Sequence, residues 1–281
     1  MRTAQKIIAA KILYRTIKMA RRALRHSDRI ITKKDGVNYE LDLSEGIDLA
    51  IYLFGGFEPS TRDALARYVK PGMTVLDIGA NIGSHTLHLA NLVGATGHVY
   101  AFEPTAFAFA KLKRNLSLNP VLAQRVVLQQ CFLTGEDFSD LPQEIYSSWP
   151  LLGGRDLHPE HLGAKKGTNG ARARTLDGVL ADNGNPVVDV VKLDVDGVEC
   201  DVLNGAITMI SLHKPIFVME LAPYLLKERG HSLEEMMSFF IPLGYRFFHH
   251  RTEKPLPSDA AAISRMIRVG ESVNVIVKCQ K

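Results

Sequence analysis

The regular alternation of apolar and helical segments constrains the fold of this chain more than any other feature. Five apolar runs have the length of buried strands: residues 73–78, 98–103, 126–133, 187–194 and 215–221. Amphipathic helical patterns follow four of them, at residues 84–92, 105–119, 197–203 and 233–240. Such alternation predicts a doubly wound α/β domain with a mostly parallel sheet covered on both faces. Residues 245–250 and 273–279 are expected to complete the sheet.

Two irregular stretches interrupt this rhythm. Residues 134–172 contain the only tryptophan, Trp149, and little periodicity, and residues 251–272 are similar. Both stretches follow strands, so we expect both over the carboxyl edge of the sheet, where doubly wound folds bind ligands. We interpret them as loops of an acceptor site. No repeat or linker divides the chain, which predicts one domain over residues 35–281 and a helical extension over residues 1–34.

The extension carries an unusual charge pattern. Residues 1–26 contain eight basic residues and no acid, while the rest of the chain has 26 basic and 30 acidic residues. On a helix, two stripes form: Lys11, Arg15, Lys18, Arg22 and Arg25 on one side, and Leu13, Ile17, Ala20 and Leu24 on the other. A basic amphipathic helix fits an anionic membrane surface. It equally fits a helix that docks on its own domain, so both interpretations stay open.

The composition sets further bounds. Hydrophobic residues make up 46% of the chain, and no apolar run approaches the roughly 18 residues of a membrane span. Charges interrupt every apolar run near the start, which argues against a secretory signal. The three cysteines, Cys131, Cys200 and Cys279, are far apart and show no pairing pattern. This predicts a reducing, cytoplasmic compartment, with a peripheral position at the inner face of a membrane as an option.

The segment D-I-G-A-N-I-G, residues 77–83, joins a predicted strand to a predicted helix. Gly79 permits a sharp turn and Gly83 permits close approach. The spacing is not the G-x-G-x-x-G of dinucleotide-binding turns, and no G-K-[ST] follows. Asp77 would repel a phosphate and suits a ligand with an ammonium group. S-adenosylmethionine, which combines an amino acid, a sulfonium and an adenosine, is such a ligand.

A second acid follows at the end of the next strand. Glu103 lies 20 residues after Gly83, where a carboxylate can accept hydrogen bonds from both ribose hydroxyls. Asp77 could instead cap the free N–H groups of the turn, and Glu103 could cap the next helix. Both acids together around a glycine turn favour the cofactor interpretation.

Three motifs resemble the FkbM-type family of class I, S-adenosylmethionine-dependent methyltransferases: VLDIGANIGSHTLHLA, VYAFEP and VVKLDVDGVECDVLNGA. The resemblance covers roughly residues 35–225, and it departs from the family at Asp196, where Glu is usual. It implies a seven-stranded sheet with an antiparallel last strand. It also implies O-methylation of a sugar, lipid-linked sugar or polyketide hydroxyl. The cofactor residues that it implies are Asp77, Gly79, Ala80, Asn81, Gly83 and Glu103, with the adenine near Cys131 and Phe132.

Acids cluster after the fourth strand. Lys192 lies in an apolar run and needs a partner if it is buried, and Asp194 is the nearest one. Asp194 could accept the proton of an acceptor hydroxyl, with Lys192 setting its charge state. Asp196 and Glu199 could simply cap the helix that begins near Gly197.

A divalent metal is an alternative at this edge. Asp194 and Glu220 could ligate Mg²⁺, but the sequence offers no clear third ligand, so no metal is favoured. The histidines are scattered. His250, near the end of a late strand, is the one that we select as a candidate base.

Other function classes fit less well. An NAD-dependent oxidoreductase shares the sheet and the second acid but needs the missing glycine spacing. A nucleic-acid methyltransferase would explain the basic extension. Exocyclic-amine enzymes of that class, however, carry N/D-P-P-[YF] after the fourth strand, and the acidic body suits a phosphate backbone poorly. A module that binds the cofactor without turnover also stays open. We expect a small-molecule or glycan acceptor.

Overall fold

The computed structural model describes residues 3–138, 140–153 and 156–279. Its main sheet has seven strands, in the order β12 (Tyr245–His249), β13 (Val273–Cys279), β11 (Ile216–Leu221), β10 (Val190–Leu193), β3 (Thr74–Ile78), β4 (His98–Phe102) and β5 (Val126–Gln129). The strands from β11 to β5 run parallel, whereas β13 is antiparallel to β11 and β12. The predicted fold class is confirmed. The strand order reverses between β3 and β10, which is where doubly wound sheets bind ligands.

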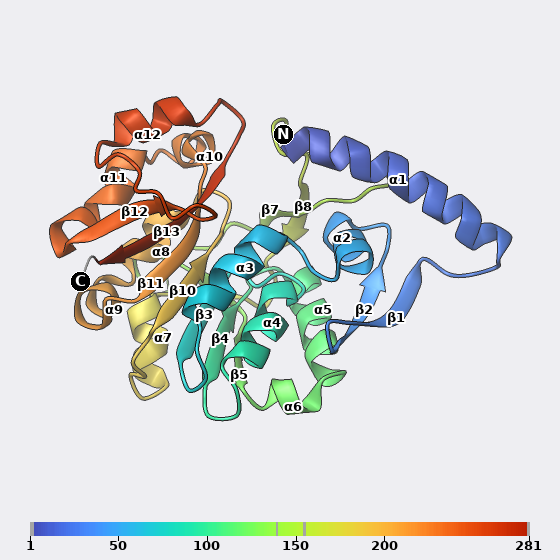
Figure 1. Ribbon diagram of the computed structural model, residues 1–281, viewed down its shortest axis with the longest axis horizontal. Coiled ribbons are helices and arrows are strands. Elements are labelled where there is room, and N and C mark those ends of the chain that lie inside the picture. Colours follow the sequence, from blue (N-terminus) through green and yellow to red (C-terminus); the bar gives the residue numbers. More distant parts are fainter. Residues whose placement is uncertain (1–2, 139, 154–155, 280–281) are drawn as a thin grey trace.

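Helices cover both faces of this sheet (Figure 1). One face carries α3 (Pro59–Tyr68), α4 (Ser84–Leu92), α5 (Ala106–Ser117) and α6 (Pro120–Ala123). The other carries α7 (Leu176–Asp182), α8 (Glu199–Asn204), α9 (Ile207–His213), α10 (Pro223–Glu228) and α11 (Leu233–Ser238). Strand β3 serves both faces because alternate side chains point to opposite sides. Val75 packs with the first group of helices, and Leu76 packs with the second.

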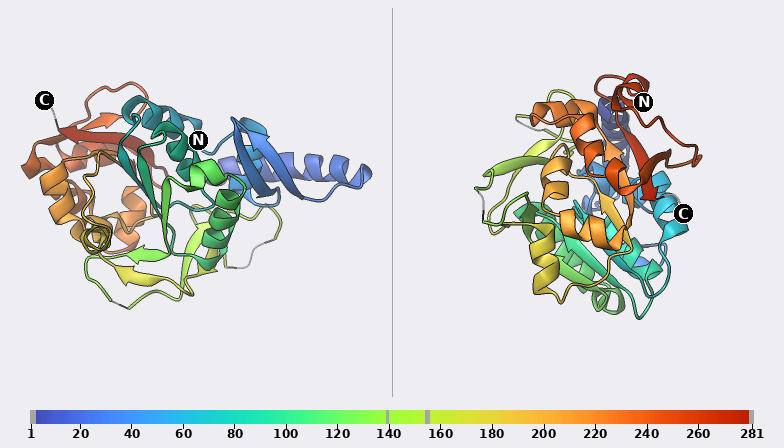
Figure 2. Two further views of the ribbon diagram at one scale, coloured as in Figure 1. Left: turned by 90° about the horizontal axis from the view of Figure 1, so that it is seen from below. Right: turned by 90° about the vertical axis from the view of Figure 1, so that its left-hand side faces the viewer.

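The described residues up to Phe54 form a further layer that packs against α5. Helix α1 (Thr3–Ala23) is followed by the antiparallel hairpin β1 (Arg29–Lys34) and β2 (Val37–Asp42), and then by α2 (Gly46–Phe54). Figure 2 shows α1 projecting beyond the sheet. The helical part of the predicted extension therefore ends at Ala23, and its last residues form β1. None of the helices within the described residues has the length and apolar content needed to cross a membrane.

Three segments differ from the sequence-based expectation. The run 126–133 is two strands, because β5 ends where its pairing with β4 ends. Strand β6 (Cys131–Leu133) then pairs with β9 (Arg172–Arg174) outside the main sheet. The stretch 134–172 contains the hairpin β7 (Glu144–Ser148) and β8 (Ala164–Gly167). The stretch 251–272 contains α12 (Ala260–Met266), and the short helix η1 (Ile241–Leu243) precedes β12.

Candidate active site

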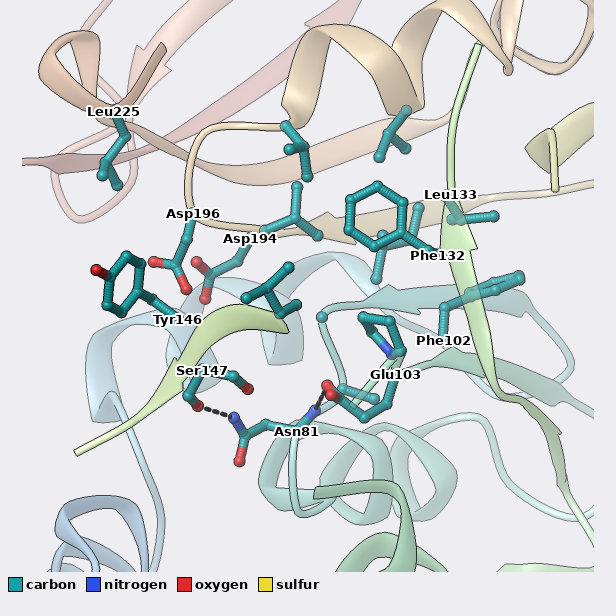
Figure 3. A pocket seen from close by; sticks show the side chains of 18 of the residues that line it. Asn81, Phe102, Glu103, Phe132, Leu133, Tyr146, Ser147, Asp194, Asp196 and Leu225 are labelled. Carbon is teal, nitrogen blue, oxygen red and sulfur yellow. Dashed lines mark hydrogen bonds between the residues drawn. The ribbon is translucent and has the colours of Figure 1, made fainter. Parts of the chain in front are cut away.

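A cavity of about 310 Å³ lies at the carboxyl ends of β3, β4 and β10, beside the point where the strand order reverses. This volume falls at the lower end of the range for ligand pockets. Four segments provide most of the wall: the turn after β3, the end of β4 with β6, the segment after β10, and strand β7 (Figure 3).

The turn after β3 depends on its two glycines. Gly79 and Gly83 have φ angles of 81° and 92°, in the left-handed region that disfavours other residues. A Cβ atom at Gly79 would overlap the carbonyl oxygen of Asp194, and one at Gly83 would press on Leu112 of α5. Gly79 thus lets the turn lie against the end of β10, and Gly83 lets α4 approach α5. Gly79, Ala80 and Asn81 line the cavity, while Gly83 lies behind this lining.

Asp77 is completely buried beneath the turn. Its Oδ2 accepts a hydrogen bond of 2.6 Å from Thr86 Oγ1, and its Oδ1 lies 3.6 Å from Lys192 Nζ. Asp77 therefore ties β3 to α4 and to β10, and it does not belong to the residues that line the cavity. Contact between Asp77 and the cofactor stays a prediction.

Glu103 is held rigidly in the cavity wall. Its Oε2 accepts a hydrogen bond of 2.9 Å from the backbone N–H of Asn81, drawn in Figure 3, and its Oε1 accepts from the backbone N–H and the hydroxyl of Thr105. Thr105 in turn caps α5. Burial raises the pKa of the Glu103 carboxyl, and these hydrogen bonds oppose that rise. The result is a carboxylate fixed at the end of β4, and its recognition of ribose hydroxyls stays a prediction.

The wall beside Glu103 is apolar. Phe102, Cys131, Phe132 and Leu133 line the cavity there, and burial raises the pKa of the Cys131 thiol, which keeps it neutral. An apolar slot next to a fixed carboxylate and a backbone turn matches the adenine, ribose and amino-acid parts of S-adenosylmethionine. The residues present therefore fit this cofactor, although they leave the position of each part as a prediction.

Lys192 has the partner that its buried position requires. Its Nζ lies 3.6 Å from both Asp194 Oδ2 and Asp77 Oδ1. It also donates hydrogen bonds to the carbonyl oxygens of Ile78, at 3.2 Å, and Gly79, at 2.8 Å. Burial lowers the pKa of Lys192, but the carboxylates of Asp194, Asp77 and Glu58 outweigh this and raise it above its usual value. The ammonium group thus holds the glycine turn against the acids that follow β10.

Three acids converge at the ends of β10 and β11. Carboxylate oxygens of Asp194, Asp196 and Glu220 lie within 4.8 Å of one another. Figure 3 shows Asp194 and Asp196 side by side in the cavity wall. Burial, and then the charge of Asp194, raise the pKa of both Asp196 and Glu220 well above the usual range. Asp196 adds to the cluster the third carboxylate that the sequence interpretation lacked, and its backbone is left-handed, with a φ angle of 51°.

The two expected capping acids behave differently. Helix α8 begins at Glu199, and the Oε1 atom of Glu199 accepts weak hydrogen bonds from the backbone N–H groups of Val195 and Gly197, at 3.4 and 3.3 Å. Glu199 therefore holds the turn before the helix. Asp196 lines the cavity instead.

A third wall comes from β7 and the segment after it. The backbone carbonyl of Ser147 accepts a hydrogen bond of 3.0 Å from Asn81 Nδ2, which joins this wall to the glycine turn. Trp149 is half-buried, stacks on Phe57 with ring centroids 6.3 Å apart, and donates from Nε1 to the carbonyl of His161. Tyr146 packs edge-on against His161. Stretch 134–172 thus contributes residues to the cavity lining, whereas this lining includes no described residue of 251–272.

His250 lies away from this site. Its Nδ1 is 2.6 Å from the carbonyl oxygen of Asn274, and its own carbonyl accepts a hydrogen bond from Arg67. It is not part of the cavity lining, because β12 is the edge strand farthest from β3.

Sequence reasoning missed Tyr146 and Ser147, for which the alternating run E-I-Y-S-S was the available signal.

Comparisons with known proteins identify the family of this chain. The methyltransferase FkbM domain family matches residues 77–247. Methyltransferase sdnD of Sordaria araneosa is 28% identical over 156 residues, which are 47% of this chain and 59% of that protein. Ribosomal protein L11 methyltransferase of Enterococcus faecalis is 37% identical over 87 residues, 30% of this chain and 27% of that protein. The chain thus spans less than two thirds of either curated relative.

Solved structures resemble the chain more distantly. Methyltransferase FkbM from Methylobacillus flagellatus KT is 18% identical, with a TM-score of 0.45 over 80% of this chain and 49% of that one. The matched family segment, by contrast, runs from Asp77 through Glu103 and Lys192 to Phe247 and contains most of the cavity wall. On this match the chain belongs to the FkbM family of methyltransferases, whose methyl donor is S-adenosylmethionine.

Proposed function

We propose that this chain transfers a methyl group from S-adenosylmethionine to a hydroxyl oxygen of a small molecule or a glycan. The observation that carries the proposal is the arrangement of one cavity. Its donor side, with the glycine turn and Glu103, adjoins an acidic side in which Asp194 lies 3.6 Å from Lys192. The donor supplies an activated methyl group. The protein must align a hydroxyl with it, exclude water and remove one proton.

Asp194 is the residue that we assign to the proton. It lines the cavity with its side chain partly exposed, and Lys192 balances its negative charge. A positioned base contributes roughly 10²–10⁴-fold to a rate. Alignment of the two reactants can contribute about 7–11 kcal/mol, which is the larger share. Lys192 acts as a positioning residue, because it holds both the turn and Asp194.

The aromatic wall favours a ring-shaped, hydroxyl-bearing acceptor. Tyr146 and Trp149 both line the cavity. Aromatic faces and a few polar groups together suit a sugar, a lipid-linked sugar or a polyketide. The location that we propose is the cytoplasm, since the three cysteines are free thiols, as a reducing compartment would keep them.

Two measurements test the proposal in sequence. Isothermal titration with S-adenosylmethionine should give a dissociation constant below about 100 µM, in the usual range for enzyme substrates. Release of S-adenosylhomocysteine should then depend on an added hydroxylated acceptor, with structured RNA as the control acceptor. Absence of binding in folded, ligand-free protein contradicts the cofactor assignment. Turnover on RNA alone contradicts the assignment of a hydroxylated small-molecule or glycan acceptor.

A further inference from the structure

Helix α1 docks on the domain through one face only. Ile7 and Tyr14 are buried. Tyr14 belongs to a hydrophobic cluster that includes Ile47 of α2, and Ala10 and Ile17 pack against this cluster. The hydroxyl of Tyr14 donates a hydrogen bond of 2.7 Å to Asp28. These four docking positions are spaced as one side of a helix. The sequence left open whether α1 docks or binds a membrane, and the structure shows that docking uses a minor part of its surface.

A second face of α1 is apolar and exposed to solvent. Ile8, Ile12 and Met19 are 53%, 63% and 74% exposed. At 100° per residue they fall within a narrow sector of the helix, turned well away from Tyr14. Leu13 and Leu24, at 43% and 67%, extend the apolar surface toward the opposite edge of the docking face. A contiguous row of this kind on a protein surface marks an interaction site.

A row of cations runs beside the apolar row. This row of cations contains Lys11, Arg15, Lys18 and Arg22, at positions i, i+4, i+7 and i+11. Residues 1–26 contain no acid. Arg15 and Arg22 are exposed, whereas Lys18 lies 3.9 Å from Asp28. Arg15 lies in the same sector as Ile8. The free surface of α1 therefore combines apolar side chains with adjoining positive charge.

We propose that this free face of α1, formed by Ile8, Ile12, Arg15, Met19 and Arg22, binds an anionic lipid bilayer while the opposite face stays docked. Apolar side chains enter the boundary between headgroups and acyl chains, and the arginines contact anionic headgroups. A nucleic acid would match the charge but would leave the apolar row in water. A bilayer satisfies both parts of the surface.

Helix α2 connects the membrane-binding helix α1 to the cavity wall. Helix α1 packs on α2, and Ile47 of α2 lines the cavity. If the proposed methyl transfer is correct, membrane binding favours an acceptor that is linked to a lipid. The binding surface itself does not depend on that function.

Vesicle flotation of the full chain tests the surface. The probes are vesicles of phosphatidylcholine alone and of equal parts of phosphatidylcholine and phosphatidylglycerol. We expect the chain to float with the anionic vesicles, at least about tenfold more than with the neutral ones, and to be released by salt. Two double variants, Ile12→Asp with Met19→Asp and Arg15→Glu with Arg22→Glu, should each lose this binding by a similar factor.

A matched double variant controls for added charge. Leu212 and Met266 are 74% and 62% exposed on other helices, and their replacement by Asp should leave flotation unchanged. Titration with S-adenosylmethionine, unchanged in all variants, separates this outcome from a failure of the proposed function. The proposal is overturned if the wild type does not float, or if the control variant loses flotation equally.

Two further outcomes would assign the surface to another partner. One is salt-dependent RNA binding that is lost with Arg15 and Arg22 but kept without Ile12 and Met19. The other is a dimer, seen by light scattering without vesicles, that the Ile12 and Met19 changes dissociate. If either result is found without vesicle binding, the partner of this face of α1 is a nucleic acid or a second copy of the chain, and not a bilayer.

Discussion

The donor side of the cavity and its acidic side are built from the same kinds of side chain, yet their surroundings differ. On the donor side, Glu103 is a single carboxylate that accepts three hydrogen bonds. On the acidic side, Asp194, Asp196 and Glu220 bring their oxygens within 4.8 Å of one another, and Lys192 lies next to only one of them at 3.6 Å. The first arrangement is satisfied within the protein, and the second is crowded with like charges.

This difference indicates two roles: the donor side keeps a fixed shape, and the acidic side can change its ionisation. A carboxylate fixed by backbone N–H groups keeps its position and suits recognition of a donor that is always the same. Crowded carboxylates hold protons more tightly, so a small change in their surroundings changes which of them is ionised. We therefore expect changes on the donor side to affect folding and binding, and changes on the acidic side to affect pH dependence and turnover.

The largest effect is expected at the contact between the two sides. Gly79→Ala would force a Cβ atom onto the carbonyl oxygen of Asp194, at a φ angle of 81°. Left-handed backbone costs about 1–2 kcal/mol for alanine, and the overlap adds about 1–3 kcal/mol. Chemical denaturation should show a loss of about 4 kcal/mol, together with loss of S-adenosylmethionine binding.

Gly244→Ala is the matched control. Gly244 has a φ angle of 86°, and a Cβ atom added there would meet no atom of the described residues within 4 Å, so it carries the backbone cost alone. The Gly79 variant should be less stable than the Gly244 variant by the cost of the overlap alone, about 1–3 kcal/mol. Equal losses of stability in the two variants would mean that the turn and the acidic side are not in tight contact. This result would contradict the proposed link between the donor side and the acidic side.

The donor side was largely visible in the sequence, because it depends on contiguous motifs. The residues 77–83 and Glu103 follow consecutive strands, and parallel strands bring their carboxyl ends together. The acidic side was visible only in part. The left-handed conformation of Asp196 and its approach to Glu220 depend on tertiary packing. His250 was selected for its position near a strand end, but β12 lies at the edge of the sheet.

Fold prediction failed at short strands, most of which have a weak hydropathy pattern. The strand β6 pairs with β9 about 40 residues later, and β7 pairs with β8 across residues whose hydropathy pattern is weak. Neither the pairing of β6 with β9 nor that of β7 with β8 leaves a local signal as strong as the apolar runs that contain β3 and β10. The same reason explains why Tyr146 was not expected in the site, although the stretch around it was.

The second prediction concerns pH. Burial raises the pKa of Glu199, behind the acidic side, from 4.5 to about 7. A carboxyl with a raised pKa binds more protons in the folded than in the unfolded state. Its contribution to stability is therefore present below pH 4.5 and is lost as the pH rises toward 7. Between about pH 5 and 7 this loss should be about 2 kcal/mol.

Glu199→Gln should remove that part of the pH dependence, since glutamine keeps an oxygen for the N–H groups of Val195 and Gly197. Urea denaturation at pH 5 and pH 7 measures it, with Glu234→Gln, an exposed position on α11, as the control. The comparison of the two sides is weakened if both variants show the wild-type slope.

The third prediction concerns turnover. Asp194→Asn should lower turnover at least tenfold while changing S-adenosylmethionine affinity by less than about twofold, because the lost charge acts on the acceptor proton. Stability should change little, because Lys192 keeps the carboxylate of Asp77 at 3.6 Å when the charge of Asp194 is removed. Steady-state kinetics and titration check this, again with Glu234→Gln as control. Unchanged turnover would remove Asp194 from the proton transfer and make Asp196 the better candidate.

The smallest effect is expected at Trp149, which tests whether the hairpin wall belongs to the acceptor. Trp149→Phe keeps an aromatic ring for stacking on Phe57 but removes the hydrogen bond to the carbonyl of His161. Stability should fall by about 1 kcal/mol. The KM for the acceptor should rise several-fold, whereas the affinity for the donor should not change, because the ring contacts of Trp149 are to Phe57 and His161. Phe138→Leu, an 81% exposed aromatic position of the same stretch, is the control and should leave the stability, the KM for the acceptor and the affinity for the donor unchanged.

If donor affinity falls as much as acceptor affinity, the hairpin closes over both ligands, and the cavity has one shared wall in place of separate donor and acceptor sides.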